Sequence, residues 1–193
     1  MKLDIILAGV GGQGVLSIAA IIAQAALKEG YKARQSEVHG MAQRGGAVLA
    51  HLRLSSRTIP GDLVPKGEAD LIISMEPTEC LRYAAWLSPS GTMVSAVEPV
   101  LNIPNYPEIK GVLDTIGAFP SHRLIETARL AREAGLAKAV NMVMVGAASP
   151  FLPLKTESLE ETITSTFASK GDAVSLADAN LKAFRLGRTA AAE

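Results

Sequence analysis

One short stretch near the start of the chain decides the fold: Leu3-Asp-Ile-Ile-Leu-Ala-Gly9-Val-Gly11-Gly-Gln-Gly14. The apolar run Leu3–Ala8 has the length of a buried strand, and a glycine ends it. Residues Gly14–Glu29 are apolar on nearly every side, which is typical of a buried helix, and Gly30 ends that helix. A strand, a glycine turn and a helix in this order predict the opening of an α/β fold.

The glycine turn fits the pattern G-x-G-x-x-G completely. In this pattern the first glycine permits a tight turn, the second lets a phosphate approach the backbone, and the third lets the helix pack close to the strand. An acidic residue near the end of the second predicted strand, Glu37, lies where a dinucleotide-binding fold carries its ribose-binding acid. The candidate cofactor-binding residues of the turn are Gly9, Gly11, Gly12, Gln13 and Gly14.

The rest of the chain alternates strands and helices in its first half and is helical in its second half. Further strands are expected at Tyr31–Ser36, Ala47–Leu54, Asp70–Met75, Thr92–Val97 and Gly111–Thr115, with a turn at Ser88–Gly91. Further helices are expected at Thr78–Leu87, Ser121–Ala134, Lys138–Ala148, Ser158–Ala168 and Val174–Leu186. This alternation predicts the α/β class, with an open, largely parallel Rossmann-like sheet and a helical C-terminal part. We expect a single domain over residues 1–187 and a frayed tail at 188–193.

The link between the second and third predicted strands departs from a dinucleotide-binding unit. Only ten residues, Glu37–Gly46, are available, and glycine interrupts them three times. A parallel crossover takes about a dozen residues or more. We therefore expect these two strands to pair as neighbours through a loop, which leaves the dinucleotide-binding unit incomplete. For the glycine turn, a purely structural role then stands beside phosphate binding as an alternative.

The densest polar cluster of the chain is the stretch Ser36-Glu-Val-His-Gly-Met-Ala-Gln-Arg-Gly-Gly46, expected to be a loop from Glu37 onward. Loops at the strand ends of open α/β sheets are where ligands bind. A guanidinium beside two glycines forms a cradle for carboxylate or phosphate, and an acid two residues from an imidazole suits proton transfer. The catalytic candidates are Glu37, His39 and Arg44, and the cofactor-binding candidates are Gln43, Gly45 and Gly46. The alternative is a surface loop in which Arg44 forms an ordinary ion pair.

Composition excludes several classes of protein. With 19 Lys+Arg against 19 Asp+Glu in 193 residues, the formal net charge is zero, which argues against nucleic acid as a partner. The single cysteine cannot form an internal disulfide or hold an iron–sulfur cluster, which usually needs four thiolates, and the scattered histidines predict no metal site. No uncharged apolar run reaches the ~18 residues of a membrane span, and the chain start is a poor signal peptide. We therefore expect a cytoplasmic protein.

Several motifs together resemble one known family. They are the glycine turn, Ser36–Gly46, Glu76-Pro77, Asn141 before an apolar run with Gly146, and Asn180 followed by Phe184 and Gly187. They are similar to the gamma subunit or domain of the 2-oxoacid (pyruvate):ferredoxin oxidoreductases, and above all to the branch of that family that acts on indolepyruvate. The resemblance implies an enzyme complex that decarboxylates a 2-oxo acid, captures the acyl group on coenzyme A and reduces ferredoxin. It also implies thiamine diphosphate, Mg and [4Fe-4S] clusters as the cofactors that carry the chemistry.

The chain lacks the motifs that would hold these cofactors. The thiamine motif Gly-Asp-Gly is met only by Gly61-Asp-Leu63 and Gly171-Asp-Ala173, neither of which has the last glycine. The resemblance therefore implies a smaller subunit that is inactive alone, with the cofactors in a larger partner and Glu37–Gly46 facing that partner or coenzyme A. An apolar fraction of 48% suggests that the partner docks on surplus apolar surface. Two alternatives remain: a stand-alone NAD(P)- or FAD-binding oxidoreductase, from the complete glycine pattern, and a non-catalytic scaffold or regulatory subunit, from the incomplete crossover.

Overall fold

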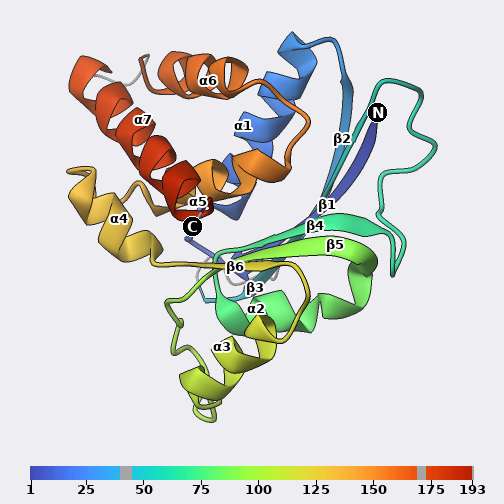
Figure 1. Ribbon diagram of the computed structural model, residues 1–193, viewed down its shortest axis with the longest axis vertical. Helices are drawn as coiled ribbons and strands as arrows, with labels where there is room; N and C mark the ends of the chain where they lie inside the picture. The colour runs from blue at the N-terminus through green and yellow to red at the C-terminus, as the bar shows by residue number, and fades with distance from the viewer. Residues whose placement is uncertain (40–44, 169–172, 193) are drawn as a thin grey trace.

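The structure, a computed structural model, describes residues 1–39, 45–168 and 173–192, which form a six-stranded sheet with helices on both faces (Figure 1). The strands are β1 (Lys2–Val10), β2 (Lys32–His39), β3 (Ala47–Ser55), β4 (Ala69–Ser74), β5 (Leu87–Ala96) and β6 (His122–Ile125). The α-helices are α1 (Val15–Lys28), α2 (Pro77–Arg82), α3 (Ile109–Gly117), α4 (Thr127–Glu133), α5 (Val140–Ala148), α6 (Thr156–Ala168) and α7 (Ala173–Ala190). Short 3₁₀ turns occupy Ala84–Trp86 and Ser149–Phe151. No helix within the described ranges is both long enough and apolar enough to cross a membrane.

The strand order is β2-β3-β1-β4-β5-β6, and β3 alone runs against the others, so the sheet is mostly parallel, as predicted. The expected pairing of the second and third strands is confirmed, because β2 and β3 form an antiparallel ladder. Since β3 returns between β1 and β2, the carboxyl ends of the five parallel strands and the start of β3 share one edge of the sheet. We call this the C-terminal edge, where ligands bind in open α/β sheets.

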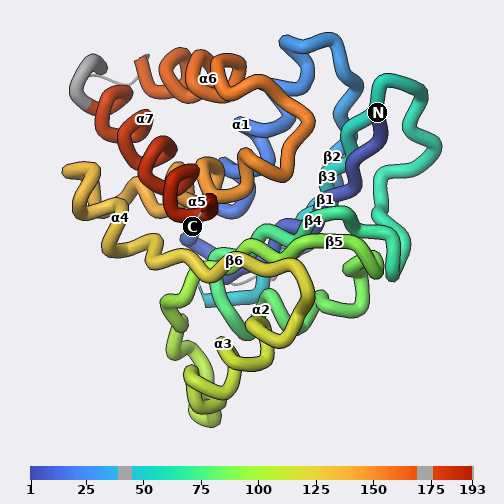
Figure 2. Tube along the Cα trace, viewed as in Figure 1, coloured from blue at the N-terminus to red at the C-terminus, as the bar shows by residue number. Residues whose placement is uncertain are grey.

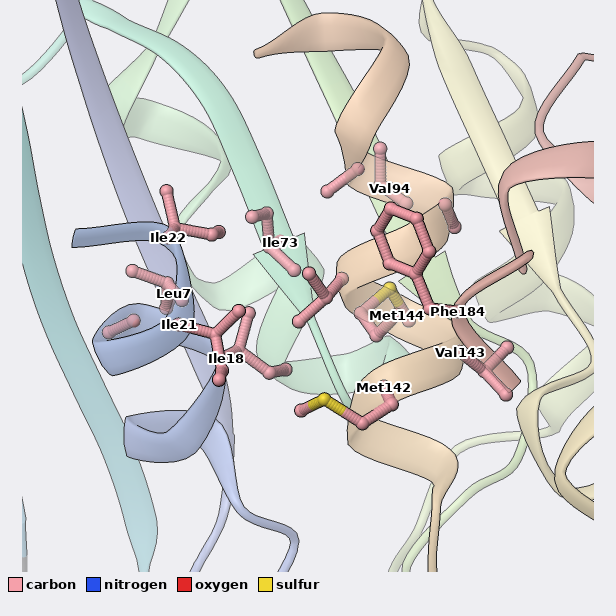
Figure 3. Packing of buried hydrophobic residues seen from close by; sticks show 14 of the residues in the cluster. Leu7, Ile18, Ile21, Ile22, Ile73, Val94, Met142, Val143, Met144 and Phe184 are labelled. Carbon is pink, nitrogen blue, oxygen red and sulfur yellow. The ribbon is translucent and has the colours of Figure 1, made fainter. Parts of the chain in front are cut away.

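One face of the sheet carries most of the core. Helices α1, α5, α6 and α7 lie on this face, which we call the four-helix face, and the short α4 packs against α5 and α7 at its margin (Figures 1 and 2). Its centre is α5, which lies between the sheet and α7 and presents Met142 and Met144 to apolar side chains of α1 and the strands (Figure 3). Phe184 on α7 is fully buried and closes this cluster from outside. The helix expected at Lys138–Ala148, from its length and alanine content, is thus confirmed as α5.

Two glycines set the distance between α5 and α7. A Cβ at Gly146 would lie 1.9 Å from the carbonyl oxygen of Phe184, and a Cβ at Gly187 would lie 1.9 Å from that of Val143. Neither position has room for any side chain, because the obstructing atoms belong to the backbone of the facing helix. The close approach of the two helices therefore requires glycine at both positions.

The opposite face, covered by α2 and α3, has a smaller core. It includes Ile6, Ile72 and Met93 from the strands, with Cys80 from α2 and Ile116 from α3. We call it the two-helix face (Figure 1). Because α2 is only six residues long and α3 only nine, this face buries less apolar surface than the first.

Two predicted elements are wrong in the region of β5. Ser88–Gly91, expected to be a turn, belongs to β5, where Leu87 pairs with Ala69 before a shift in register. β6 pairs with β5 only from Met93 onward, so Pro89 needs no hydrogen-bonding partner on that side. The predicted helix Thr78–Leu87 is correspondingly shorter, since α2 ends at Arg82 and a 3₁₀ turn precedes β5.

Two further predictions are wrong between β5 and α5. Gly111–Thr115, expected to be a sixth strand, lies in α3, because Val112 and Ile116 at i and i+4 place one apolar stripe against the core. Ser121–Ala134, expected to be one helix, divides into β6 and α4. The carboxylate of Glu98 fixes the start of α4 by accepting hydrogen bonds from Thr127 Oγ1 (2.9 Å) and the Ala128 amide (2.8 Å).

The C-terminal helix is longer than the predicted Val174–Leu186. α7 continues to Ala190, and Ala191 is buried. The carbonyl oxygen of Ala191 accepts a hydrogen bond of 2.7 Å from Arg123 Nε on β6. As far as Ala191, the tail that we expected to be frayed is therefore packed against the sheet.

Candidate functional site

The glycine turn joins β1 to α1 at the C-terminal edge, and three of its glycines have steric reasons to be there. A Cβ at Gly9 would lie 2.8 Å from Val15 Cγ2, which explains the close approach of strand and helix. Gly12 and Gly14 have φ values of 102° and 78°, in the left-handed region that favours glycine. Gly14 is also the N-cap of α1, and a Cβ there would lie 2.9 Å from Asn141 Nδ2 on α5.

Gln13 bridges the crevice between β1 and β4. β1 leads into α1 on the four-helix face and β4 leads into α2 on the two-helix face, so the topological switch point lies between these strands. The Gln13 side chain accepts a hydrogen bond from the Val10 amide (2.7 Å) and donates one to the Met75 carbonyl (2.9 Å). The place where a doubly wound fold binds its nucleotide is thus spanned by a side chain of the turn itself, which favours a structural role for Gln13.

The end of the polar stretch lies against the glycine turn. The Gly11 amide donates to the Gly46 carbonyl (2.8 Å), and the Gly45 amide donates to the Gly11 carbonyl (3.4 Å). The structure thereby brings together the two groups of candidates, the glycine turn and Gly45–Gly46. Gln43 and Arg44, and the side chain of His39, lie outside the described residues.

Glu37 and His39 lie in β2 and not in a loop as expected, because β2 extends its ladder with β3 to the pair His39–Val48. Glu37 pairs with Ala50, which in turn pairs with Leu7 of β1. With β3 in between, Glu37 is two strand spacings, about 10 Å, from β1. A ribose-binding acid would have to lie on the strand beside β1, so this position does not support that interpretation. The Glu37 carboxylate accepts a hydrogen bond of 3.1 Å from Gln35 Nε2.

The Glu76-Pro77 motif places a buried carboxylate beside the switch point, at the start of α2. Glu76 follows β4, is only 1% exposed, and caps α2 by accepting a hydrogen bond from the Glu79 amide (2.9 Å) through Oε2. Its other oxygen accepts hydrogen bonds from the Val100 amide (3.4 Å) and from the Tyr106 hydroxyl. Burial, and then the hydrogen bond to Glu76, raise the pKa of Tyr106, so the phenol stays protonated and acts as the donor.

Asn102 is a residue that sequence reasoning missed. Its Nδ2 donates a hydrogen bond of 2.6 Å to the carbonyl oxygen of Gly45, across 57 positions of sequence. The segment between β5 and α3 is thus attached to Glu76 on one side and to the polar stretch on the other. The three prolines at 99, 104 and 107 were the available indication of an irregular but fixed segment.

The described residues do not fit thiamine diphosphate or an iron–sulfur cluster. Asp62 of the incomplete Gly61-Asp62-Leu63 motif accepts a hydrogen bond of 2.6 Å from Arg34, and the Gly61 carbonyl accepts one from Arg53. Cys80 is fully buried, and burial raises the pKa of its thiol to about 12, so it offers no thiolate. Across the described parts of the chain, no three His, Cys, Asp or Glu side chains are placed to hold a metal ion. The Gly171–Ala173 motif includes undescribed residues.

Solved structures with the same fold include two 2-oxoacid:ferredoxin oxidoreductases. The gamma subunit of a keto/oxoacid ferredoxin oxidoreductase from Geobacter sulfurreducens matches with a TM-score of 0.72 at 22% identity, covering 98% of each chain. The 2-oxoglutarate:ferredoxin oxidoreductase from Magnetococcus marinus matches with a TM-score of 0.79 at 22% identity, covering 99% of this chain and 31% of that one. At these identities the likeness shows the fold.

Sequence relatives extend along nearly the whole chain. Indolepyruvate oxidoreductase subunit IorB from Thermococcus kodakarensis is 38% identical over 98% of this chain and 96% of its own length. The same subunit from Methanothermobacter thermautotrophicus is 37% identical over 100% of both chains. Residues 4–190 match the pyruvate ferredoxin/flavodoxin oxidoreductase family. The chain therefore belongs to the pyruvate ferredoxin/flavodoxin oxidoreductase family.

Proposed function

We propose that this chain is the smaller subunit of a 2-oxoacid:ferredoxin oxidoreductase that converts indolepyruvate or a related arylpyruvate to its acyl-coenzyme A. The observation that carries the proposal is the gradient of similarity within the family. Indolepyruvate oxidoreductase subunits are 35–38% identical to this chain, whereas 2-oxoglutarate synthase subunits are 26–30% identical. We therefore assign to this chain the substrate class of the more similar group, the arylpyruvates.

In this proposal the chain is inactive alone, and a larger subunit holds the thiamine diphosphate, Mg and [4Fe-4S] clusters and passes electrons to ferredoxin. Two observations support this division. The described residues do not fit either group, and the only cysteine of the sequence is buried. In addition, this chain matches only 35% of the ketoisovalerate oxidoreductase subunit VorA of Methanothermobacter thermautotrophicus, so there the same fold is continuous with further polypeptide.

The candidate site has a defined role in this proposal. Gly45–Gly46 and the glycine turn meet at the C-terminal edge, as the Gly11–Gly46 and Gly45–Gly11 hydrogen bonds indicate. We assign to Arg44 and the neighbouring glycine amides the binding of an anionic group of coenzyme A or of the oxo acid. Glu37 and His39 remain candidates for orienting or protonating that ligand.

Co-expression with the larger subunit tests the function. The purified complex is expected to reduce ferredoxin or a viologen dye with indolepyruvate, and to depend on coenzyme A. Pyruvate and 2-oxoglutarate, supplied at the same concentration, measure selectivity, and the smaller chain alone should give no rate. A complex that prefers 2-oxoglutarate or pyruvate would overturn the substrate assignment.

Substitutions at Arg44 and Glu37 separate a site from a scaffold. In the reconstituted complex, Arg44→Ala is expected to raise the KM for coenzyme A or the oxo acid about tenfold or more, since a charge-assisted pair is lost. Arg57→Ala, an exposed arginine in the loop between β3 and β4, is the matched control and should leave KM unchanged. Full turnover with unchanged KM in both Arg44→Ala and Glu37→Ala would instead favour the scaffold role.

A further inference from the structure

Residues 97–108, which we call the strap, join β5 to α3 and run along the two-helix face (Figure 2). At its start, the Val97 amide donates a hydrogen bond to the Ile125 carbonyl (3.1 Å). Further on, the Val100 amide and the Tyr106 hydroxyl both donate to the buried carboxylate of Glu76. Together with the Asn102–Gly45 hydrogen bond, these contacts fix the strap on both sides of residues 101–103.

The fixed part of the strap exposes two large apolar side chains. Leu101 is 75% exposed and Ile103 is 49% exposed, and they flank the anchored Asn102. A third, Val38 at 63%, lies at the end of β2. Val38 pairs with Leu49, whose side chain packs on the smaller core, so Val38 also belongs to the two-helix face. Two exposed apolar side chains, Leu101 and Ile103, on a segment held by hydrogen bonds on either side are typical of an interaction surface.

We propose that Leu101 and Ile103 form the docking surface for the larger, cofactor-bearing subunit. This inference rests on the proposed function. If the chain contributes Gly45–Gly46 and the glycine turn to an active site whose cofactors lie in the partner, the partner must cover the C-terminal edge beside Gly45. Leu101 and Ile103 are tied to that position through Asn102, so the same partner covers them.

The relatives support this choice of occupant. In the Magnetococcus marinus enzyme, this fold makes up only 31% of a longer chain, so it is accompanied there by further polypeptide of the same chain. In a protein whose fold is a separate chain, the corresponding contacts would have to form between subunits. Prior anchoring of the strap by Glu76 and Asn102 lowers the entropy lost when those contacts form.

The test measures affinity between the intact smaller chain and the purified larger subunit by biolayer interferometry. Leu101→Asp and Ile103→Asp are each expected to raise the Kd about tenfold or more, because each removes a buried apolar side chain and places a charge in the interface. Leu63→Asp is the matched control, with an expected change below about twofold. Leu63 is 58% exposed and belongs to the loop between β3 and β4, where its carbonyl accepts a hydrogen bond from Arg53 of β3. That loop lies near the N-terminus and away from the strap (Figure 1).

Each outcome bears on a definite claim. If the wild-type chain binds and the double variant Leu101→Asp/Ile103→Asp binds equally well, the docking surface is wrong and the proposed function stands. If the wild-type chain does not bind the larger subunit at all, both are wrong. Sedimentation of the smaller chain alone tests whether a second copy of this chain occupies the surface instead. A wild-type dimer that becomes a monomer on Leu101→Asp would show that a second copy occupies the surface, and would overturn the inference.

Discussion

The two faces of the sheet differ in what holds their helices. On the four-helix face, α5 and α7 approach until backbone meets backbone at Gly146 and Gly187, and apolar side chains fill the remaining space. On the two-helix face, a buried carboxylate and its donors fix the strap, and apolar side chains stay exposed on it. The close-packed first face suits a role in stability, whereas the second carries the anchored strap that we propose as a docking surface.

The largest expected effect comes from closing the gap between α5 and α7. Gly187→Ala and Gly146→Ala should each lower the free energy of unfolding by about 3 kcal/mol, because the new Cβ collides with a carbonyl oxygen of the facing helix. Urea denaturation followed by circular dichroism measures this. Gly111→Ala in α3 is the control. A Cβ there meets nothing within 4 Å, so the helix should gain about 0.5–1 kcal/mol. If Gly111→Ala lowered the free energy of unfolding as much as Gly146→Ala and Gly187→Ala, the two faces would not differ in how tightly their helices pack.

The next effect concerns the anchor of the strap. Glu76→Gln should lower the free energy of unfolding by about 2 kcal/mol, since the amide cannot accept all the hydrogen bonds that the buried carboxylate accepts. Tyr106→Phe should lower it by about 1 kcal/mol and speed proteolysis within residues 97–108. Tyr31→Phe, a half-buried tyrosine packed against the core of the other face, is the control. Unchanged protease resistance in both strap variants would contradict an anchored strap.

A smaller effect is expected where the strap meets the polar stretch. Asn102→Ala removes one exposed hydrogen bond, to Gly45, and should change the free energy of unfolding by only about 0.5 kcal/mol. Its effect on affinity for the larger subunit should be greater, about threefold to tenfold in Kd, because the docking residues lose their support. Asn105→Ala, an exposed asparagine on the same strap, serves for comparison. If both variants bind alike, the Asn102–Gly45 contact does not position the surface.

The smallest effect is a pH dependence on the two-helix face, from one histidine. Burial, and then the charge of Arg53, lower the pKa of His51, whose Nδ1 accepts a hydrogen bond of 3.1 Å from the Val64 amide. Below about pH 6.5 the unfolded chain therefore binds a proton that the folded chain does not, so stability falls as the pH decreases through this value. It levels off below the pKa of the folded state. Denaturation midpoints between pH 8 and pH 5 should show a shallower decline for His51→Gln than for the wild type.

The local sequence pattern predicted most of the first third of the fold, although β2 continues through Glu37 to His39. The glycine turn between Leu3–Ala8 and Gly14–Glu29 predicts β1 and α1, and the short Glu37–Gly46 link correctly predicts the β2–β3 pairing. Predictions were wrong where distant partners decide the structure. The pairing with Ala69 draws the residues after Leu87 into β5, and Glu98, nearly 30 positions away, fixes where α4 begins. The local pattern around Pro89 and Gly91 predicts a turn, because it contains no information about these distant contacts.

The candidate site was predictable only in part, for the same reason. The glycine turn and Gly45–Gly46 do come together, as their shared position at strand ends suggests. The hydrogen bonds from Asn102 to Gly45 and from Tyr106 to Glu76 span 57 and 30 positions, and no spacing rule connects such pairs. The buried position of Glu76 also depends on the strap that covers it, which the sequence pattern describes only as irregular.

The position of β2 at one end of the sheet has a consequence for aggregation. An edge strand exposes unpaired backbone groups to which a foreign strand can add, and charged side chains oppose this addition. β2 carries Lys32, Arg34 and Glu37, and the strand at the other end, β6, is only four residues long. Neither edge is therefore a good template for another strand. In a chain with 48% hydrophobic residues, both edges thus oppose polymerisation through the sheet.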